Sequence, residues 1–322
     1  MLRCELPLKV HSHLAPQVYD TPVNSILAWE ASGLSAPPVE ALPEPLVEKI
    51  LSRLAFNRHP QPTPEGLRSV YSHWCRAVPF DNIRKLIHVR AQNLKPLPGT
   101  TAVNFFEAWL KYGTGGTCWP GAGALHALLR SLGFHALRGI GTMMAAPNLP
   151  PNHGTVLVNL DDQKFLVDSS MLHGEPLNLT EGSAGLIDHP AWGVKTRWQN
   201  EKCFVLWRPL ARLEGFQCRV ERFGATSSEF QSFYERTRAW SPFNYELSIR
   251  LNRGETVIGV AFGHVVTILA DGKVIRTPLA PDQRVRFLVE DIGITEGLAQ
   301  QLPLDVPTPS PPGSRGAQRL AV

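Results

Sequence analysis

The stretch TGGTCWPGAGALHALLRSLGF, residues 114–134, joins a glycine-rich turn to a helical pattern and carries a cysteine at the junction. A helix with one buried stripe is predicted from leucines at helical spacing, Leu125, Leu128, Leu129 and Leu132. Gly133 followed by Phe134 is typical of a helix C-terminus, and Pro120 suits the first turn. Cys118 is therefore predicted at the N-terminal end of a buried helix.

Helical and strand-like patterns alternate in blocks on both sides of this stretch. Residues 45–134 are helical in pattern, 135–220 consist mainly of short β-like runs, and 221–302 mix helix and strand. Residues 1–44 are predicted to be a loose N-terminal arm, and the proline-rich residues 303–322 a disordered tail. We expect an α+β protein with an N-terminal helical bundle, a central antiparallel β-barrel-like region and a C-terminal mixed α/β lid.

Composition excludes several classes of function. The 322-residue chain is 43% hydrophobic and carries a net charge of only +4, without a basic run, so no nucleic-acid partner is expected. It contains no apolar run of the ~20 residues that span a bilayer, and no secretory signal is recognisable at its start. The five cysteines are an odd number and widely scattered, which favours free thiols and a cytoplasmic location.

A β-hairpin is predicted over NHGTVLVNLDDQKFLVDSS, residues 152–170. If Asp161–Asp162 form a two-residue turn, Thr155 pairs with Asp168 across the hairpin. His153 and Asp168 are then diagonal neighbours on one face, with Cα atoms roughly 7–8 Å apart, so imidazole and carboxylate can meet. A register slip of one residue would separate them.

Cys118, His153 and Asp168 together suit nucleophilic catalysis. A helix N-terminus favours the thiolate, His153 would act as base and Asp168 would orient the imidazole. Backbone N–H groups of the turn, at Gly116 and Thr117, would stabilise an oxyanion. Each residue alone is more typical of a structural role, a buried thiol, a packed histidine or a turn former, and the combination in this order favours catalysis.

A metal site is not expected, because the sequence contains no CxxC pair and no HExxH motif. The other cysteines and the histidines His126 and His135 are predicted to have packing roles. The glycine-rich turn also lacks the lysine of a phosphate-binding loop.

These motifs resemble those of the arylamine N-acetyltransferases. TGGTC is similar to the family's RGG-x-C element, and the hairpin with its following SSML resembles H-x-x-L-x-V…D-x-G-F-G. VPFDNI (residues 78–83), FYERTRAWSPF (233–243) and LVEDIGI (288–294) resemble three further family elements in the same order. The resemblance covers about residues 45–302 and implies a cysteine-proteinase-like core in which Cys118, His153 and Asp168 form the triad.

The departures from the family pattern indicate a repacked nucleophile turn, at Thr114 and Pro120, and a changed acceptor wall, where Ser170 and Leu172 replace the glycines of D-x-G-F-G. Thr114 stands where the family has arginine, and Pro120 where an acidic residue is common. The resemblance implies substrate-binding roles for Phe80, Met171 and Phe243, of which Met171 replaces the usual aromatic residue.

The resemblance implies ping-pong transfer of an acyl group from acetyl-CoA or another acyl-CoA, through a Cys118 thioester, to a small-molecule amine. Three alternatives stay open: a transglutaminase-like or papain-like amidase, a biosynthetic enzyme that takes its acyl group from an acyl carrier protein, and a non-catalytic ligand-binding relative. No metal and no membrane partner are expected in any of them.

Overall fold

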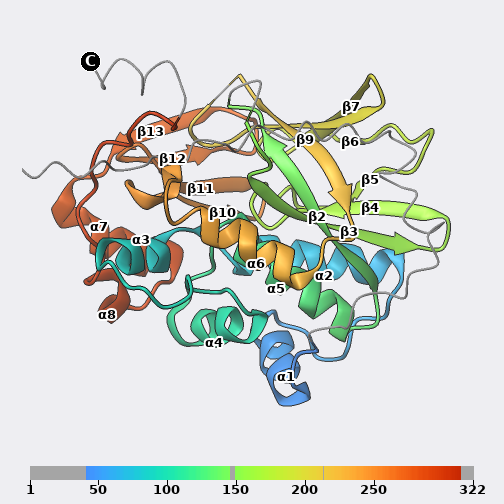
Figure 1. Cartoon of the computed structure of the whole chain (residues 1–322), viewed down its shortest axis with the longest axis horizontal. Coiled ribbons are helices and arrows are strands. Elements are labelled where there is room, and N and C mark those ends of the chain that lie inside the picture. Colours follow the sequence, from blue (N-terminus) through green and yellow to red (C-terminus); the bar gives the residue numbers. More distant parts are fainter. Residues whose placement is uncertain (1–40, 146–148, 213, 313–322) are drawn as a thin grey trace, which may run out of the picture.

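The computed structural model describes residues 41–145, 149–212 and 214–312. Its helices gather along one side of the molecule and its two sheets along the other (Figure 1). The first half of the described chain is mainly helical, with α1 (Glu44–Arg53), α2 (Pro64–Ala77), strand β1 (Phe80–Asp81), α3 (Ile83–Arg90), α4 (Ala102–Tyr112) and α5 (Cys118–Ser131). Threonine side chains cap two of these helices: Thr63 accepts from the Gly66 amide at α2, and Thr101 from the Asn104 amide at α4.

Helix α5 lies at the centre of the molecule, where it packs against α4, α6 (Ser227–Arg236) and the strands β2 and β3. The predicted leucine stripe is buried. Gly133 ends the helix in the left-handed conformation at φ +86°, and the Phe134 amide donates to the Leu129 carbonyl at 3.0 Å. Both ends of this predicted helix are confirmed, and Cys118 is its first residue.

An antiparallel sheet of eight strands packs on α5, in the order β5-β4-β3-β2-β9-β8-β7-β6. Its two edge strands, β5 and β6, also contact each other, so the sheet closes almost into a barrel. The strands are β2 (His135–Met143), β3 (His153–Leu160), β4 (Gln163–Val167), β5 (Leu177–Asn178), β6 (Leu186–Ile187), β7 (Val194–Gln199), β8 (Lys202–Trp207) and β9 (Phe216–Phe223).

The hairpin of β3 and β4 has the predicted register. Leu160 pairs with Gln163 and Val156 with Val167, so Asp161–Asp162 form the two-residue turn, with Asp161 at φ +49°. One step beyond the Val156–Val167 pair, Thr155 faces Asp168. The hairpin arithmetic that brought His153 and Asp168 together is therefore confirmed.

A second antiparallel sheet, of five strands, follows α6 in the chain and has the order β1-β10-β11-β12-β13. β1 thus joins this sheet from the helical half, pairing Phe80 with Arg250 on β10. The other strands are β10 (Ile249–Arg253), β11 (Thr256–Ala261), β12 (His264–Ile268) and β13 (Val274–Pro278).

The helical segment of residues 281–292 consists of three different pieces. It runs from a 3-10 turn, η4 (Pro281–Gln283), through α7 (Arg284–Phe287) into a π-helical turn, η5 (Leu288–Ile292), before α8 (Glu296–Ala299). Gly293 at φ +88° ends η5. The widened turn lets Leu288 and Ile292 both face the apolar cluster beneath the five-stranded sheet.

Residues 303–309 contact the body of the protein, unlike the free tail that their composition suggested. Asp305 forms an ion pair with Arg284 at 3.0 Å and accepts from the Leu247 amide at 3.0 Å. The Thr308 amide and hydroxyl both donate to Glu246. Specific side-chain contacts hold this segment in place, and amino-acid composition alone does not predict such contacts.

The predicted α+β class, with helices, a barrel-like antiparallel sheet and a C-terminal α/β part, is confirmed. The predicted arm over residues 1–44 lies mostly outside the described residues, and so does the end of the predicted tail. In the described part of the chain, every helix is too short or too polar to cross a bilayer.

Candidate active site

The nucleophile turn, residues 114–117, needs glycine for space. A Cβ on Gly115 would come within 1.9 Å of the Pro79 carbonyl oxygen, which no rotation of a side chain relieves. A Cβ on Gly116 would lie 3.0 Å from Pro120 and 3.1 Å from Phe105. Backbone packing against β1 therefore excludes a side chain at Gly115, and the Pro120 and Phe105 rings leave little room for one at Gly116.

Asp81 anchors this turn from the end of β1. Its buried carboxylate accepts from the Thr114 hydroxyl at 2.9 Å, from the Gly115 amide at 2.6 Å and from the Ile83 amide at 3.0 Å. Burial raises the pKa of Asp81, and the three donors oppose that shift. Thr114 therefore offers a neutral hydroxyl to this carboxylate at the position where the family pattern has arginine.

Cys118 begins α5 and is 7% exposed. Thr117, the residue before it, gives no side-chain cap to the helix. The first N–H groups of a helix have no intrahelical acceptor, so those of Cys118 and Trp119 are available to a ligand. The Cys118 thiol lies 3.9 Å from the Asn152 carbonyl, which places it at the start of β3.

His153 and Asp168 form a buried pair with Nε2 and Oδ2 only 2.7 Å apart. Burial alone would lower the pKa of His153, but the Asp168 charge and hydrogen bond, with a further contribution from Cys118, raise it. The pKa of Asp168 is lowered: burial would raise it, and His153 outweighs that effect. One edge of the imidazole thus faces Asp168, and the ring also interacts with Cys118.

Backbone groups hold Asp168 in place. Its second oxygen, Oδ1, accepts from the amides of Ser170 and Met171, each at 2.9 Å. The Tyr71 hydroxyl, on α2, donates to the Asp168 carbonyl at 2.8 Å and accepts from the Asp168 amide at 3.1 Å. Helix α2 therefore positions the end of the hairpin, a contact that sequence reasoning missed.

Two of the three predicted substrate-binding residues lie together. The rings of Phe80 and Phe243 meet edge to face with centroids 5.2 Å apart, and Asn82 links their segments by donating to the Phe243 carbonyl at 3.1 Å. Met171 is buried in a different apolar cluster, with Leu166 and Leu177 among its members, and does not join them. The predicted roles in substrate binding stay predictions.

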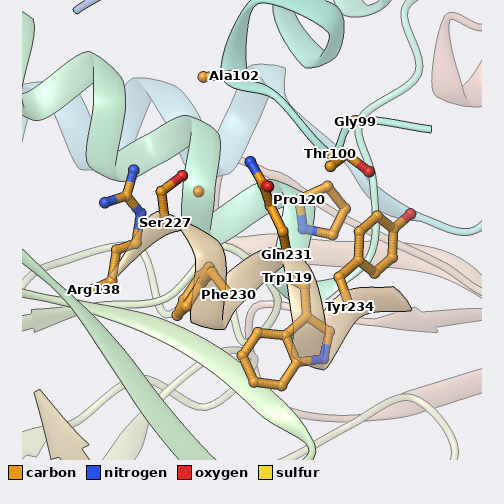
Figure 2. A pocket seen from close by; sticks show the side chains of 11 residues that line it. Gly99, Thr100, Ala102, Trp119, Pro120, Arg138, Ser227, Phe230, Gln231 and Tyr234 are labelled. Carbon is orange, nitrogen blue, oxygen red and sulfur yellow. The ribbon is translucent and has the colours of Figure 1, made fainter. Parts of the chain in front are cut away.

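A small cavity of about 20 Å³ opens behind the start of α5 (Figure 2). Trp119 lies at its lower edge, Pro120 above Trp119, and the Tyr234 ring to the right of Pro120. Trp119 stacks on Phe233 of α6 with centroids 5.3 Å apart and meets Phe230 edge to face at 5.0 Å. These aromatic contacts fix α6 against the residue that follows Cys118, and sequence reasoning did not anticipate them.

The other described cysteines, Cys75, Cys203 and Cys218, are buried free thiols whose pKa values burial raises, to about 12 for Cys75 and Cys203. His126 is buried in α5, where burial and then nearby arginines lower its pKa to about 3, so it stays neutral. Among the described residues, no group of three or more His, Cys, Asp or Glu side chains could hold a metal ion.

Comparison with known sequences identifies one family. The family model described as N-acetyltransferase matches residues 63–206, which contain Asp81, the nucleophile turn and all three residues of the predicted triad. No curated protein sequence matches the chain.

Solved structures resemble the described chain over most of its length. The arylamine N-acetyltransferase of Mycobacterium abscessus superposes with a TM-score of 0.67 at 16% identity, over 79% of this chain and 92% of that one. The Nocardia farcinica enzyme gives 0.66 at 17%, over 87% and 96%. The Mycobacterium marinum enzyme in complex with CoA gives 0.66 at 17%, over 79% and 96%. The predicted relationship is confirmed: residues 63–206 match the N-acetyltransferase family model, and the chain has the arylamine N-acetyltransferase fold.

Proposed function

We propose that this chain is an N-acyltransferase that carries an acyl group on Cys118 between a coenzyme A thioester and an amine. The observation that carries the proposal is the placement of Cys118 at the start of buried α5, beside a histidine that binds Asp168 at 2.7 Å. The matching family model over residues 63–206 supports the same reading.

In the first half-reaction, His153 takes the proton of Cys118, and the thiolate attacks the carbonyl carbon of the donor thioester. The N–H groups at the start of α5 face the negative charge that develops on the carbonyl oxygen. When the tetrahedral intermediate collapses, the bond to the coenzyme A sulfur breaks, and that sulfur leaves with the proton from His153. Acyl-Cys118 and free coenzyme A are the products.

In the second half-reaction, an amine attacks acyl-Cys118 and gives its proton to neutral His153. The bond between acyl carbon and Sγ then breaks, and the proton returns to Cys118 while the amide leaves. Asp168 fixes the imidazole through both steps and stabilises its charged form. Every residue of the proposed triad is at most 7% exposed, so the proton transfers are shielded from bulk water.

The donor we propose is a coenzyme A thioester. The M. marinum enzyme binds CoA and shares the fold, which supports this donor over the carrier protein considered from the sequence. We also propose a cytoplasmic location, because the mechanism requires a reduced Cys118 and the described cysteines are free thiols.

Intact-mass analysis after incubation with acetyl-CoA tests the proposal. We expect an acetyl adduct on the wild-type protein, release of one coenzyme A per chain, and loss of both in Cys118→Ala. Cys203→Ala is the matched control, since it removes an equally buried free thiol outside the triad and should keep the adduct. Coenzyme A release without a transient adduct, or an adduct that persists in Cys118→Ala, would contradict the proposal.

A further inference from the structure

Lys85 is a buried cation close to the proposed nucleophile. It lies in the first turn of α3, directly after the β1 segment that packs on the nucleophile turn, and is only 3% exposed. β1 reaches that turn through the Phe80–Gly116 bridge, and the Asp81 amide donates to the Gly116 carbonyl at 3.2 Å. A negative charge on Cys118 favours the ammonium form of Lys85 and raises its pKa against the effect of burial.

The ammonium group of Lys85 lacks the partners that a buried charge ordinarily requires. Its Nζ lies 5.9 Å from the centroid of the Tyr234 ring and, within the described residues, has no hydrogen-bond acceptor or ion-pair partner. The charge of Glu235 also influences it, but Glu235 forms its ion pair with Arg238 instead. Among the described residues, this cation therefore has no counter-charge and no hydrogen-bond acceptor.

Tyr234 ties this cation to the nucleophile turn. Its ring faces Lys85, its hydroxyl donates to the Pro98 carbonyl at 2.8 Å, and it lines the small cavity together with Trp119 and Pro120 at the start of α5. On the other side, α3 packs against η3 (Pro242–Asn244), which carries Phe243, one of the predicted substrate-binding residues. The helix that carries Lys85 thus contacts the segment of Phe243, and the ammonium group lies over the Tyr234 ring beside the start of α5.

We propose that Lys85 is a specificity-determining residue that binds a substrate carboxylate next to Cys118. A carboxylate in this position supplies the counter-charge that the protein lacks, and bidentate geometry is not needed because an ammonium acts as a point charge. The carboxylate belongs either to the acyl group, as in a dicarboxylic monothioester, or to the amine acceptor, as in an amino acid or aminobenzoate. Assigning the carboxylate to the acyl group or to the acceptor depends on the proposed acyl transfer. The existence of an anion site at Lys85 does not depend on it.

The site is sensitive to pH. Burial lowers the pKa of Lys85 to about 7, against opposing contributions from Cys118 and Glu235. The titratable and charged groups around it are Cys118, Tyr234, Glu235 and Arg238. A bound carboxylate favours the protonated ammonium, so carboxylate binding should weaken as the pH rises above about 7.

Alkylation of Cys118 tests the anion site without any acyl transfer. Iodoacetate and iodoacetamide react with the same thiolate and differ mainly in charge, so the ratio of their rates cancels the reactivity of the thiol. We expect Lys85→Met to lower the iodoacetate-to-iodoacetamide ratio by about tenfold, as for a unit charge lost at close range. Lys85→Arg should keep the ratio, since it keeps the charge.

Lys111→Met is the matched control. Lys111 also lies over a tyrosine ring, with Nζ 4.9 Å from the centroid of Tyr112, but its side chain is exposed on α4. We expect its ratio to equal that of the wild type. A ratio that is unchanged in Lys85→Met, in a variant that melts cooperatively, would overturn the proposal. So would an equal fall of both rates, which indicates a general structural role.

Two substrate arms identify the source of the carboxylate. Adduct formation is compared for succinyl-CoA against acetyl-CoA, and product formation for para-aminobenzoate against its methyl ester. If the acyl group carries the carboxylate, Lys85→Met loses the preference for succinyl-CoA. If the acceptor carries it, the same variant loses the preference for aminobenzoate. Wild-type protein without preference in either arm overturns the substrate assignment, while absence of any adduct refutes the acyl transfer and leaves the alkylation result standing.

Discussion

Asp168 and Lys85 are both buried charges near Cys118, but their surroundings differ completely. Asp168 is fully buried, and its carboxylate accepts from His153, from the Ser170 amide and from the Met171 amide. Lys85 is 3% exposed, and within the described residues its ammonium has a tyrosine face nearby and no hydrogen-bond acceptor. One charge is satisfied by the protein itself, and the other is not.

The contrast separates two uses of buried charge. A satisfied carboxylate costs little to keep and fixes its neighbours, which suits a group that orients a base. An unsatisfied ammonium destabilises the free protein and gains most when an anion arrives, which suits a group that selects a ligand. Substitutions at four positions test this difference between the two charges.

The largest effect is expected from Asp168→Asn. The asparagine keeps the shape but removes the charge that raises the pKa of His153, so imidazolium formation loses its support. We expect turnover to fall by about 10³–10⁴-fold, with adduct formation slowed in the same proportion. Stopped-flow measurement of coenzyme A release from acetyl-CoA checks this, and a fall below tenfold would show that Asp168 does not orient the base.

Lys85→Met should stabilise the folded protein. Replacing an unpaired buried charge by an apolar side chain of similar length is expected to raise the free energy of unfolding by about 2–3 kcal/mol. Because the pKa of Lys85 is about 7 in the folded protein against an ordinary 10.5, both states are protonated below pH 7 and the native state bears the full cost. Between these values the unfolded state binds more protons, so wild-type stability rises with pH.

The gain from Lys85→Met should therefore be greatest below pH 7 and shrink toward pH 10.5. Urea unfolding of both proteins at several pH values measures it. A loss of stability at low pH would mean that Lys85 has an anionic partner in the free protein.

Thr114→Val should have a smaller effect, on the anchored turn. Valine preserves the volume but removes the hydroxyl that donates to Asp81 at 2.9 Å, so a buried carboxylate loses one of its three donors. We expect a loss of about 1–2 kcal/mol of stability and a further rise in the pKa of Asp81. Thr114→Ser, which keeps the hydroxyl, should recover most of the stability in thermal unfolding.

Tyr71→Phe is expected to have the smallest effect. It removes the hydroxyl that binds the backbone of Asp168 on both sides and also accepts from the His173 amide at 3.2 Å. We expect about 1 kcal/mol of destabilisation and a modest fall in kcat at unchanged KM, since Tyr71 acts through Asp168. Ile268→Val, a core change in the five-stranded sheet, should destabilise the fold without moving kcat at temperatures well below its melting point.

The geometry of the proposed triad could be predicted because it depends on local features of the sequence, namely turn length, strand register and helix boundaries. A two-residue turn fixes the hairpin register, and the register alone brings His153 and Asp168 together. The position of Cys118 followed equally from a glycine turn and the start of a leucine-striped helix. Neither the position of Cys118 nor the pairing of His153 with Asp168 depends on contacts with distant segments.

The surroundings of the triad could not be predicted in the same way. Lys85 lies in IRKLIHVR, which reads as an ordinary surface helix, and it is buried only because α6 and η3, some 150 residues later, close over α3. Met171 lies in the core of the barrel-like sheet, in a different apolar cluster from Phe80 and Phe243, and the hairpin pattern does not show this separation. Asp81 and Thr114 are 33 residues apart, and the sequence of neither segment predicts the hydrogen bond between them.

The bridge between Phe80 and Gly116 should slow amide hydrogen exchange in the nucleophile turn. A glycine-rich loop ordinarily exchanges its amide hydrogens within seconds, but here the Gly115 amide donates to a buried carboxylate and the Gly116 carbonyl binds the Asp81 amide. Both amides can exchange only when β1 detaches from the turn, and β1 is itself an edge strand of the five-stranded sheet. In deuterium, the Gly115 amide should therefore retain its proton as long as β1 stays paired in the sheet.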